Sequence, residues 1–336
     1  MRTAILILLW ACLLPAALAQ NYAGRDDVKG FINVMVERHG FVRSELIALF
    51  SKVRSQAAVL RAMAAPAESA PRSWQAYRSR FVNAARIEAG LKFYERYEET
   101  LQRAAKIYGV PADIIVAIIG VETVYGRNTG AYRVIDALAT LAFDYPPRAE
   151  FFRGELEQYL LHGRQDSIDV LGQKGSYAGA IGIPQFMPGS YRRYAVDFDG
   201  DGKRDLSASV SDAVGSVANF LKEHGWQRSQ PVAFSARVSG DRFRALVASG
   251  MKPVYLGTDL PGFEVSVDEP FDRNAGIVLI ELESPGLSPE YRVGLDNFYV
   301  LTRYNRSSYY ALSVVDLAGE ISSALARQRG TSPGSR

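Results

Sequence analysis

The feature that most restricts how this chain can fold is an apolar stretch, residues 110–126, with a single carboxylate near its end. Pro111 and Asp113 are favoured in the first turn of a helix, and Gly126 is a natural helix stop. We therefore expect one helix across the stretch. Glu122 then lies on the same face as several isoleucines, because residues three and four apart are neighbours on a helix.

Glu122 has the surroundings that a general acid needs. Its carboxylate is expected to be partly desolvated, and it lies near the negative end of the helix dipole. Both effects disfavour the anion and raise the pKa, which suits proton donation near neutral pH. A surface carboxylate at a frayed helix end, or one paired with an arginine, would fit the same residues.

The N-terminus is typical of a secretory signal, residues 1–19, with Arg2 before an apolar run and small residues before a cleavage site. Cys12, the only cysteine, lies within it. The alternative is an outer-membrane lipoprotein anchored through Cys12, but the bulky Trp10 disfavours this. We expect a soluble periplasmic protein, because no other segment is long and apolar enough to span a bilayer.

The rest of the chain divides by composition into several regions. At 336 residues and a net charge of +3 it is large enough for two or three domains and shows no basic arm for nucleic acid. The pattern predicts a mainly α fold of the α+β class, with a glycine-dense loop at residues 172–182 and a strand at residues 277–282. The expected parts are a helical domain (20–109), a core (110–226 and 295–326), a small β-containing domain (227–294) and a disordered tail (327–336).

A second motif is typical of a metal site. Asp197, Asp199 and Asp201 occupy positions one, three and five of a loop, a glycine follows, and Lys203 could offer its carbonyl at position seven. Position twelve is Ala208, so the usual bidentate Glu is missing. A solvated acidic turn is the simpler reading. Crowded carboxylates repel one another without a cation, which favours a calcium site.

Several motifs in the same order resemble the B-type lytic murein transglycosylases. The similarity runs from about Trp74 to the end of the core, and it rests on residues 121–126, 175–180, 184–188, 197–202, 218–220 and 304–307. It implies a lysozyme-like core that cleaves the β-1,4 bond between N-acetylmuramic acid and N-acetylglucosamine in peptidoglycan. It also implies that Glu122 is the only catalytic carboxylate, protonating the leaving oxygen and then deprotonating the muramic C6 hydroxyl, which closes a 1,6-anhydro ring.

The resemblance assigns roles to further residues. Ser176 would hydrogen-bond Glu122 or the substrate's acetamido group, and Gln185 would hold substrate beside the scissile bond. Tyr304 and Asn305 would close the cleft near Glu122. Sugar-stacking walls would be formed by Tyr77, Phe186, Met187, Phe220 and Tyr310.

Three positions carry less direct implications. Phe220 stands where related sequences often have Tyr, so a hydroxyl contact is lost there. Arg148 matches an arginine expected to meet the acidic stem peptide, although Pro147 replaces what is often a second arginine. The resemblance favours Asp212 as the residue that closes the metal loop, and Asp205 is the other possibility.

The expected partners are peptidoglycan glycan strands and, beyond them, other cell-wall enzymes; we expect a monomer. Two other functions remain open. A hydrolytic muramidase would leave reducing sugar ends, whereas a non-catalytic peptidoglycan-binding scaffold would release no product. The presence of Glu122, Ser176, Gln185 and Tyr304 together argues against the scaffold.

Overall fold

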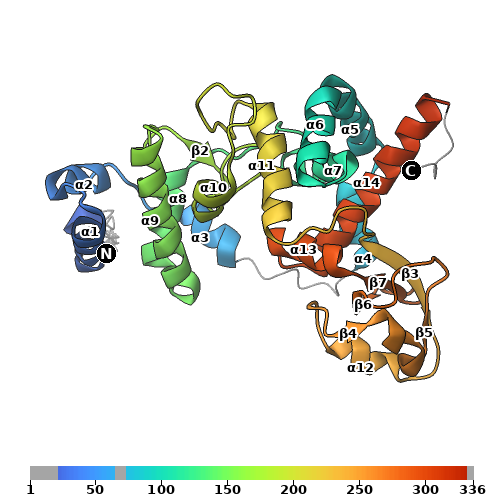
Figure 1. Ribbon diagram of the computed structural model, residues 1–336. Coiled ribbons are helices and arrows are strands. Elements are labelled where there is room, and N and C mark those ends of the chain that lie inside the picture. The colour runs from blue at the N-terminus through green and yellow to red at the C-terminus, as the bar shows by residue number, and fades with distance from the viewer. Residues whose placement is uncertain (1–21, 65–72, 331–336) are drawn as a thin grey trace, which may run out of the picture.

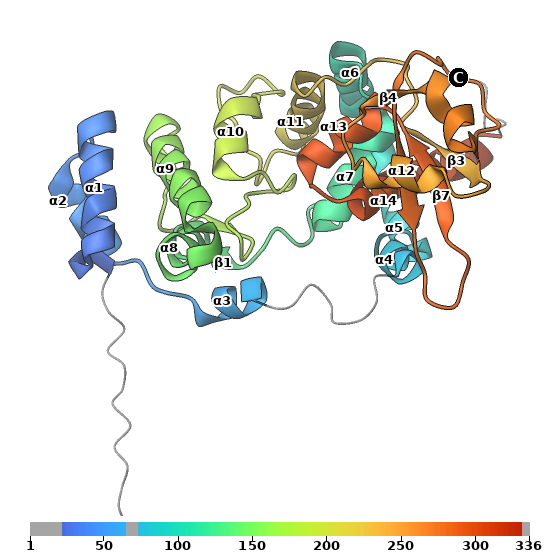
Figure 2. The same cartoon turned by 90° about the horizontal axis from the view of Figure 1, so that it is seen from below.

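The computed structural model describes residues 22–64 and 73–330, which fold into a helical protein with one five-stranded sheet and one short two-stranded sheet (Figures 1 and 2). This confirms the predicted mainly α class. The predicted signal sequence, including Cys12, lies outside the described residues. Within them, no single helix is long and apolar enough to cross a membrane; the bent pair of residues 98–108 and 112–123 passes the same test only when taken together.

One lobe joins the N-terminal helices to helices from the middle of the chain (Figure 2). Tyr22 donates a hydrogen bond to Asp144 at 2.6 Å, and the backbone amide of Arg54 donates to Asp136 at 3.0 Å. The elements of this lobe are η1 (Tyr22–Gly24), α1 (Asp26–His39), α2 (Arg43–Phe50), α3 (Ala57–Ala64), α8 (Val134–Asp144), η2 (Pro146–Arg148), α9 (Ala149–Gln165) and α10 (Pro188–Tyr194).

A second lobe surrounds the apolar helix. Its elements are α4 (Trp74–Phe81), α5 (Ala84–Arg96), α6 (Glu98–Tyr108), α7 (Ala112–Thr123), α11 (Val210–Glu223), α13 (Asp296–Tyr304) and α14 (Ser308–Gln328). Four of these helices, α5, α6, α11 and α14, pack on α7. Ile115, Ile118 and Ile119 are fully buried, which explains why this stretch is apolar on nearly every side.

The prediction of a single helical domain over residues 20–109 is wrong. The helices before residue 65 belong to the lobe of α8 and α9, whereas α4, α5 and α6 pack around α7 and its neighbours (Figure 2). The physical reason is that the buried carboxylate of Asp136 and the hydroxyl of Thr140, both on α8, accept hydrogen bonds from the backbone that enters α3.

One face of the five-stranded sheet has its own apolar core, whereas Val278, Ile280 and Leu282 on the other face belong to the main core of the helices. Its strands are all antiparallel and follow the order β4–β6–β7–β3–β5. The predicted strand at 277–282 is confirmed as part of β6. The elements are β3 (Ala233–Val238), α12 (Phe243–Ala248), β4 (Tyr255–Leu256), η3 (Gly257–Phe263), β5 (Val265–Ser266), β6 (Gly276–Leu282) and β7 (Glu290–Gly294). We propose that residues 227–294 are a small inserted domain.

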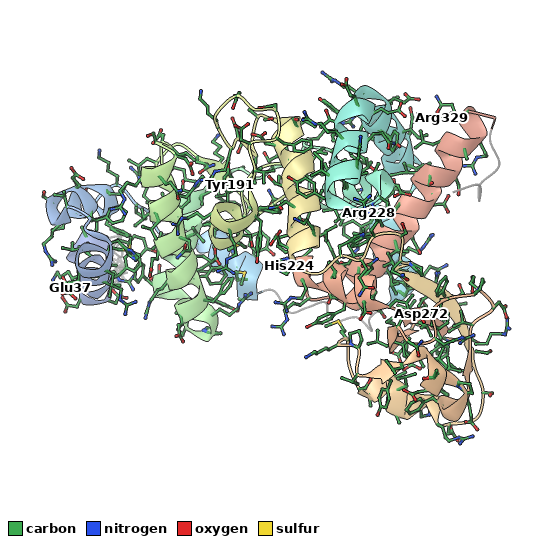
Figure 3. The ribbon with its side chains drawn as sticks, viewed as in Figure 1. Glu37, Tyr191, His224, Arg228, Asp272 and Arg329 are labelled. Carbon is green, nitrogen blue, oxygen red and sulfur yellow. The ribbon has the colours of Figure 1, made fainter. Side chains whose placement is uncertain are left out.

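The last helix is longer than predicted. α14 continues to Gln328, and Arg329, which Figure 3 labels at the end of this helix, donates to Glu98 at 2.9 Å. The predicted disordered tail is therefore wrong for residues 327–330, because an ion pair with α6 fixes this end. Residues 331–336 lie outside the described part of the chain.

Candidate active site

The helix that carries Glu122 ends earlier than the sequence predicts. It stops at Thr123, and Val124 and Tyr125 both adopt left-handed backbone angles, with φ of 52° and 61°. A β-branched residue rarely takes this conformation, so surrounding contacts must hold it there. The predicted stop at Gly126 is wrong by three residues, because the chain turns before it reaches the glycine.

Thr123 holds this turn in place. Its side chain is fully buried, and its hydroxyl donates to the carbonyl of Ile183 at 2.8 Å. The same oxygen accepts a hydrogen bond from the amide of Gly126 at 3.0 Å. Thr123 therefore ties the end of α7, next to Glu122, to the loop that carries Gln185. Sequence reasoning missed this role, because a threonine beside the acid could equally face solvent.

The environment of Glu122 keeps a substantial fraction of its carboxyl protonated near neutral pH. Its side chain is only partly exposed, and burial raises its pKa from 4.5 to about 7. A hydrogen bond from the hydroxyl of Tyr310, at 2.7 Å, acts in the opposite direction and lowers the pKa. Among the described residues no arginine or lysine forms an ion pair with Glu122, so the structural ion-pair alternative does not apply.

Three tyrosines surround the carboxyl group. The rings of Tyr304 and Tyr310 are nearly parallel, with centroids 6.4 Å apart. The hydroxyl of Tyr304 donates to the carbonyl of Pro184 at 2.6 Å. Burial, and then the charge of Glu122, raise the pKa of both Tyr304 and Tyr77. Residues more than 180 positions apart in the sequence thus meet at Glu122.

Removing the Tyr310 hydroxyl should shift the pH dependence of activity. The hydroxyl stabilises the anion of Glu122, so Tyr310→Phe should raise the pKa of that carboxyl further. Because the acid must be protonated to act, the alkaline limb of the pH–rate profile should move to higher pH by about one unit, the size of a hydrogen bond to a charged group. Initial rates measured from pH 5 to 9 test this; an unmoved or acid-shifted limb would contradict it.

Ser176 and Gln185 lie on two loops that are packed closely together. The hydroxyl of Ser176 accepts hydrogen bonds from the amides of Ala178 and Ala180, and no hydrogen bond joins it to Glu122 in the described residues. Gln185 donates from its side-chain amide to the carbonyls of Thr129 and Gly182. The amide nitrogen of Gln185 therefore stabilises the loop, which leaves its carbonyl oxygen for a ligand.

The loop that carries Ser176 also lies tightly against the loop of Gly130, and this contact depends on a glycine. Gly130 has a φ of +100°, and a Cβ there would lie 2.0 Å from the carbonyl oxygen of Gly175. Any other residue at position 130 would push this loop away from the backbone at Gly175, directly before Ser176. The short strands β1 (Tyr132–Arg133) and β2 (Lys174–Gly175) pair just beside this point.

Three of the predicted sugar-stacking residues are wrong in that role. Phe186, Phe220 and Tyr310 are only 2%, 5% and 2% exposed, so none offers a ring face to a ligand. Phe186 and Phe220 instead pack on the ring of Tyr304, with ring centroids 5.8 and 4.9 Å from its centroid. Tyr77 and Met187 are half-buried, so the stacking role stays a prediction for these two.

Two further predicted residues are exposed. Asn305 directly follows α13, and its carbonyl accepts a hydrogen bond from the amide of Ser307. Arg148 lies in the other lobe, at the start of α9, with its guanidinium 4.5 Å from the ring centroid of Phe151. Within residues 22–64 and 73–330, the side-chain contacts of Arg148 are with Phe151 and Phe152, not with the group around Glu122, so a direct role in the chemistry is not expected.

The acidic loop brings three carboxylates together. Oxygen atoms of Asp197, Asp199 and Asp212 lie within 4.8 Å of one another, but Asp201 is not part of this group. Asp212 is 1% exposed and accepts hydrogen bonds from the amides of Phe198 and Asp205. It is the third residue of α11, in the first turn of the helix beside the loop.

The two predicted closing residues are now distinguished. Asp205 accepts hydrogen bonds from the amides of Ser207 and Ala208, both at 2.9 Å, and so caps its own turn. Burial raises the pKa of Asp212, its backbone hydrogen bonds lower it, and the charge of Asp199 raises it. A hard cation with oxygen ligands fits this donor set, because it would offset the crowding of the three carboxylates.

A helical core that holds one half-buried acid at the end of its central helix defines a lysozyme-like protein. The sequence matches the family model described as the transglycosylase SLT domain over residues 23–319. The membrane-bound lytic murein transglycosylase B of Escherichia coli is 41% identical over 315 residues, which cover 91% of this chain and 85% of that protein. The chain therefore belongs to the lytic murein transglycosylases of this family.

Solved structures agree with this assignment. The catenated lytic transglycosylase SltB1 of Pseudomonas aeruginosa is 46% identical, with a TM-score of 0.86 over 92% of this chain and 100% of that chain. Escherichia coli Slt35, solved in complex with calcium, is 41% identical, with a TM-score of 0.81 over 92% and 96%. Pseudomonas aeruginosa SltB3, solved with NAG-NAM-pentapeptide, is 31% identical, with a TM-score of 0.78 over 90% and 80%.

Proposed function

We propose that this protein cleaves the β-1,4 bond between N-acetylmuramic acid and N-acetylglucosamine in peptidoglycan and leaves a 1,6-anhydromuramic end. One observation carries the proposal: the lone carboxyl of Glu122, with a pKa of about 7, held by Tyr310 at the end of a buried helix. The 41% identity to a lytic murein transglycosylase supports the same substrate. The identity of the new ends in digests of purified sacculi tests it.

The pKa of Glu122 suits a residue that gives up a proton and takes one back. In the first step its carboxyl protonates the glycosidic oxygen as the bond from C1 to that oxygen breaks. The resulting carboxylate then accepts the proton of the C6 hydroxyl, whose oxygen forms the new bond to C1. No water is consumed, and Glu122 is protonated again at the end. A pKa near the working pH serves both steps.

A hydrolase with paired carboxylates is disfavoured. Such enzymes place a second Asp or Glu across the cleft, as a base for water or as a nucleophile. In residues 22–64 and 73–330, no second carboxylate shifts the pKa of Glu122; only burial and Tyr310 do. The acetamido group of the substrate would then stabilise the cationic intermediate.

Substrate contacts are proposed for the residues that remain accessible. The carbonyl oxygen of Gln185 and the hydroxyl of Ser176 would hold the sugars beside Glu122, with Ser176 facing the acetamido group. Tyr304 and the exposed Asn305 would close the cleft, and Tyr77 and Met187 would contact sugar rings. The buried Phe220 takes no part in a hydroxyl contact. Arg148 would meet a carboxylate of the peptide stem.

We further propose that the acidic loop binds calcium. Asp197, Asp199 and Asp212 would be the side-chain ligands, with the Lys203 carbonyl added, whereas Asp201 would be a peripheral residue. The calcium-bound relative supports this choice of ion. Calcium would stabilise the fold, because the loop is packed on α6, where Arg103 donates to the carbonyl of Phe198 at 2.6 Å.

Export to the cell envelope is proposed from the N-terminal sequence, and a membrane-bound relative agrees with that location. Cleavage after Ala19 would release a soluble periplasmic protein that begins at Gln20. The intact mass of the native protein should therefore match residues 20–336. A diacylglyceryl group on Cys12, with the protein in the membrane fraction, would contradict release and leave the enzymatic proposal unchanged.

A further inference from the structure

Arg86, on α5, reaches across to the end of the helix that carries Glu122. Its guanidinium donates a hydrogen bond to the carbonyl of Gly120, which lies two residues before the acid in α7. The side chain of Arg86 is half-buried, and its guanidinium carbon lies 5.5 Å from the ring centroid of Phe81. The proposed chemistry does not use this residue.

The charge of Arg86 has no carboxylate partner. Within residues 22–64 and 73–330 the guanidinium forms no ion pair, and its hydrogen bond goes to an uncharged carbonyl. Burial lowers the pKa of the guanidinium, and only Tyr125 acts in the opposite direction. A partly desolvated cation without a counter-ion costs stability. The specific contribution of Arg86 is therefore its bond to the end of α7.

The carbonyl of Gly120 is the point from which the chain leaves α7. It also accepts the backbone amide of Val124, at 3.1 Å, and Val124 is the first residue of the left-handed turn. The last carbonyls of a helix lack a full set of intrahelical partners, and a cation is favoured at this end of the helix dipole. Arg86 thus fixes the last turn of α7 at the oxygen that starts the turn.

Tyr125 makes a second link between α7 and α5, in the reverse direction. Its hydroxyl donates to the backbone carbonyl of Arg86 at 2.9 Å. Only glycines leave room for this hydroxyl, because a Cβ at Gly90 of α5 or at Gly120 of α7 would lie 2.5 or 2.6 Å from its oxygen. We call the two links together the α5 clamp. They hold residues 120 and 125, and Glu122 lies between these residues.

The carboxyl of Glu122 lies on the other side of α7 from the α5 clamp. Residues two apart on a helix point about 200° away from each other, so Gly120 faces α5 while Glu122 faces α14. There the carboxyl accepts the hydrogen bond from Tyr310 at 2.7 Å. Its charge also acts on Tyr304 of α13 and Tyr77 of α4. The α5 clamp and Tyr310 therefore hold the same short segment from opposite sides.

We infer that Arg86 is a positioning residue for the catalytic carboxyl: through Gly120 it holds the end of α7 so that Glu122 stays within hydrogen-bond reach of Tyr310. The inference rests on the proposed function, because the position of this carboxyl affects the rate only if Glu122 is the acid. Positioning matters for proton transfer, since a displacement of about 1 Å can lower a rate by roughly 100-fold.

Arg86→Met tests the inference through the rate. Methionine removes the guanidinium and keeps an apolar side chain against Phe81. It should lower kcat by about 10- to 100-fold and leave KM unchanged, because a misplaced acid slows proton transfer and not glycan binding. The alkaline limb of the pH–rate profile should rise by about one unit, and Tyr310→Phe should add little to this shift in the double variant. Arg86→Lys keeps a charged donor and should restore most of the rate.

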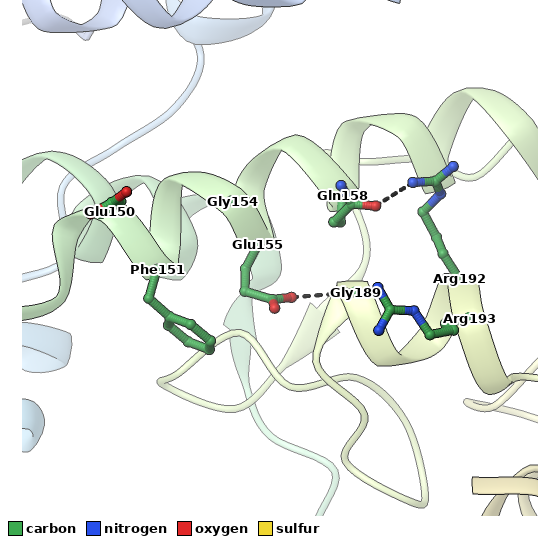
Figure 4. A pocket seen from close by; sticks show the side chains of 8 residues that line it. All are labelled: Glu150, Phe151, Gly154, Glu155, Gln158, Gly189, Arg192 and Arg193. Atoms are coloured by element: carbon green, nitrogen blue, oxygen red, sulfur yellow. Dashed lines mark hydrogen bonds between the residues drawn. The ribbon is translucent and has the colours of Figure 1, made fainter. Parts of the chain in front are cut away.

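Arg192→Met is the matched control for stability. Arg192 is also half-buried, and it donates to the side-chain oxygen of Gln158, which joins α10 to α9 in the other lobe (Figure 4). In the part of the chain that the structure describes, it forms no ion pair either. Its loss removes a comparable bond between helices and should leave the pKa of Glu122 unchanged. This separates positioning from a general loss of stability.

The pKa of Glu122 can be measured without substrate, by carbon-13 NMR of the carboxyl signal that is missing in Glu122→Gln. It should be about 7 in the wild type and about one unit higher in Arg86→Met, because the bond from Tyr310 is weakened. Tyr125→Phe removes only one link of the α5 clamp and should give a smaller shift in the same direction, which provides the test if Arg86→Met does not fold.

An unmoved or lowered pKa of Glu122 in both Arg86→Met and Tyr125→Phe would overturn the inference. So would a shift of the same size in Arg192→Met, because it would show that any loss of stability has this effect. If the wild-type protein cleaves no peptidoglycan, the proposed function fails, and the titration still decides whether Arg86 positions Glu122.

Discussion

Glu122→Gln should lower the rate of peptidoglycan cleavage by roughly 10²–10⁴-fold or more while glycan binding stays close to normal. Glutamine keeps the shape of the side chain and can still accept the hydrogen bond from Tyr310. It cannot donate a proton to the glycosidic oxygen or take one from the C6 hydroxyl. The loss should be at the high end of this range, because one carboxyl performs both transfers. Release of soluble fragments from sacculi gives the rate, and co-sedimentation with sacculi gives the binding.

The stability of this variant provides an internal control. In the wild type the folded state raises the pKa of Glu122 from 4.5 to about 7, so the folded state holds this proton more tightly than the unfolded chain. The stability that the carboxyl contributes is therefore lost as pH rises through that window. Glu122→Gln should melt no lower than the wild type at pH 8. Glu99→Gln, at an exposed site on α6, should change neither rate nor melting. Near-normal lysis by Glu122→Gln would refute its assignment as the acid.

Calcium should have the largest effect on stability. A ligand that binds only the folded state stabilises it by about 2.7 kcal/mol at a concentration one hundred times its Kd. For a chain of this size that corresponds to a rise in Tm on the order of 5 °C. Calcium should raise Tm, a chelator should lower it, and Asp212→Asn should abolish the response, because Asp212 is the buried member of the three-carboxylate group.

The control for the calcium site is Asp205→Asn. Asparagine can still accept the amide hydrogen bonds of the turn at residues 205–208, and Asp205 lies outside the group of three carboxylates. This variant should keep the full response to calcium. Identical melting curves with calcium, magnesium and chelator would reduce the loop to a solvated acidic turn.

Features set by neighbouring residues could be predicted from the sequence. The apolar run of α7 and the pattern of strand β6 are local signals, and both elements form close to the predicted positions. The raised pKa of Glu122 also follows from its place on an apolar helix, since burial is its main cause. The acidic loop was recognisable because its aspartates are two residues apart.

Features that depend on long-range packing could not be predicted. Tyr310 was expected to form a sugar-binding wall, but it is buried and bonds Glu122 across 188 residues. The helical spacing of apolar residues predicts that such an aromatic side chain lies on the apolar face of its helix. It does not predict which distant residue the side chain contacts. The N-terminal helices were assigned to one domain for the same reason, because the hydrogen bond between Tyr22 and Asp144 spans 122 residues.

The central claim is that Glu122 acts alone and that the muramic C6 hydroxyl, not water, attacks C1. Mass spectrometry of sacculus digests made with the purified protein tests this most directly. The single carboxyl predicts that nearly all new muramic ends are 1,6-anhydro, each lighter by one water molecule than a reducing end. The same ends should be missing from digests with Glu122→Gln. A predominance of reducing muramic ends would contradict the account, because it would require a second group that activates water.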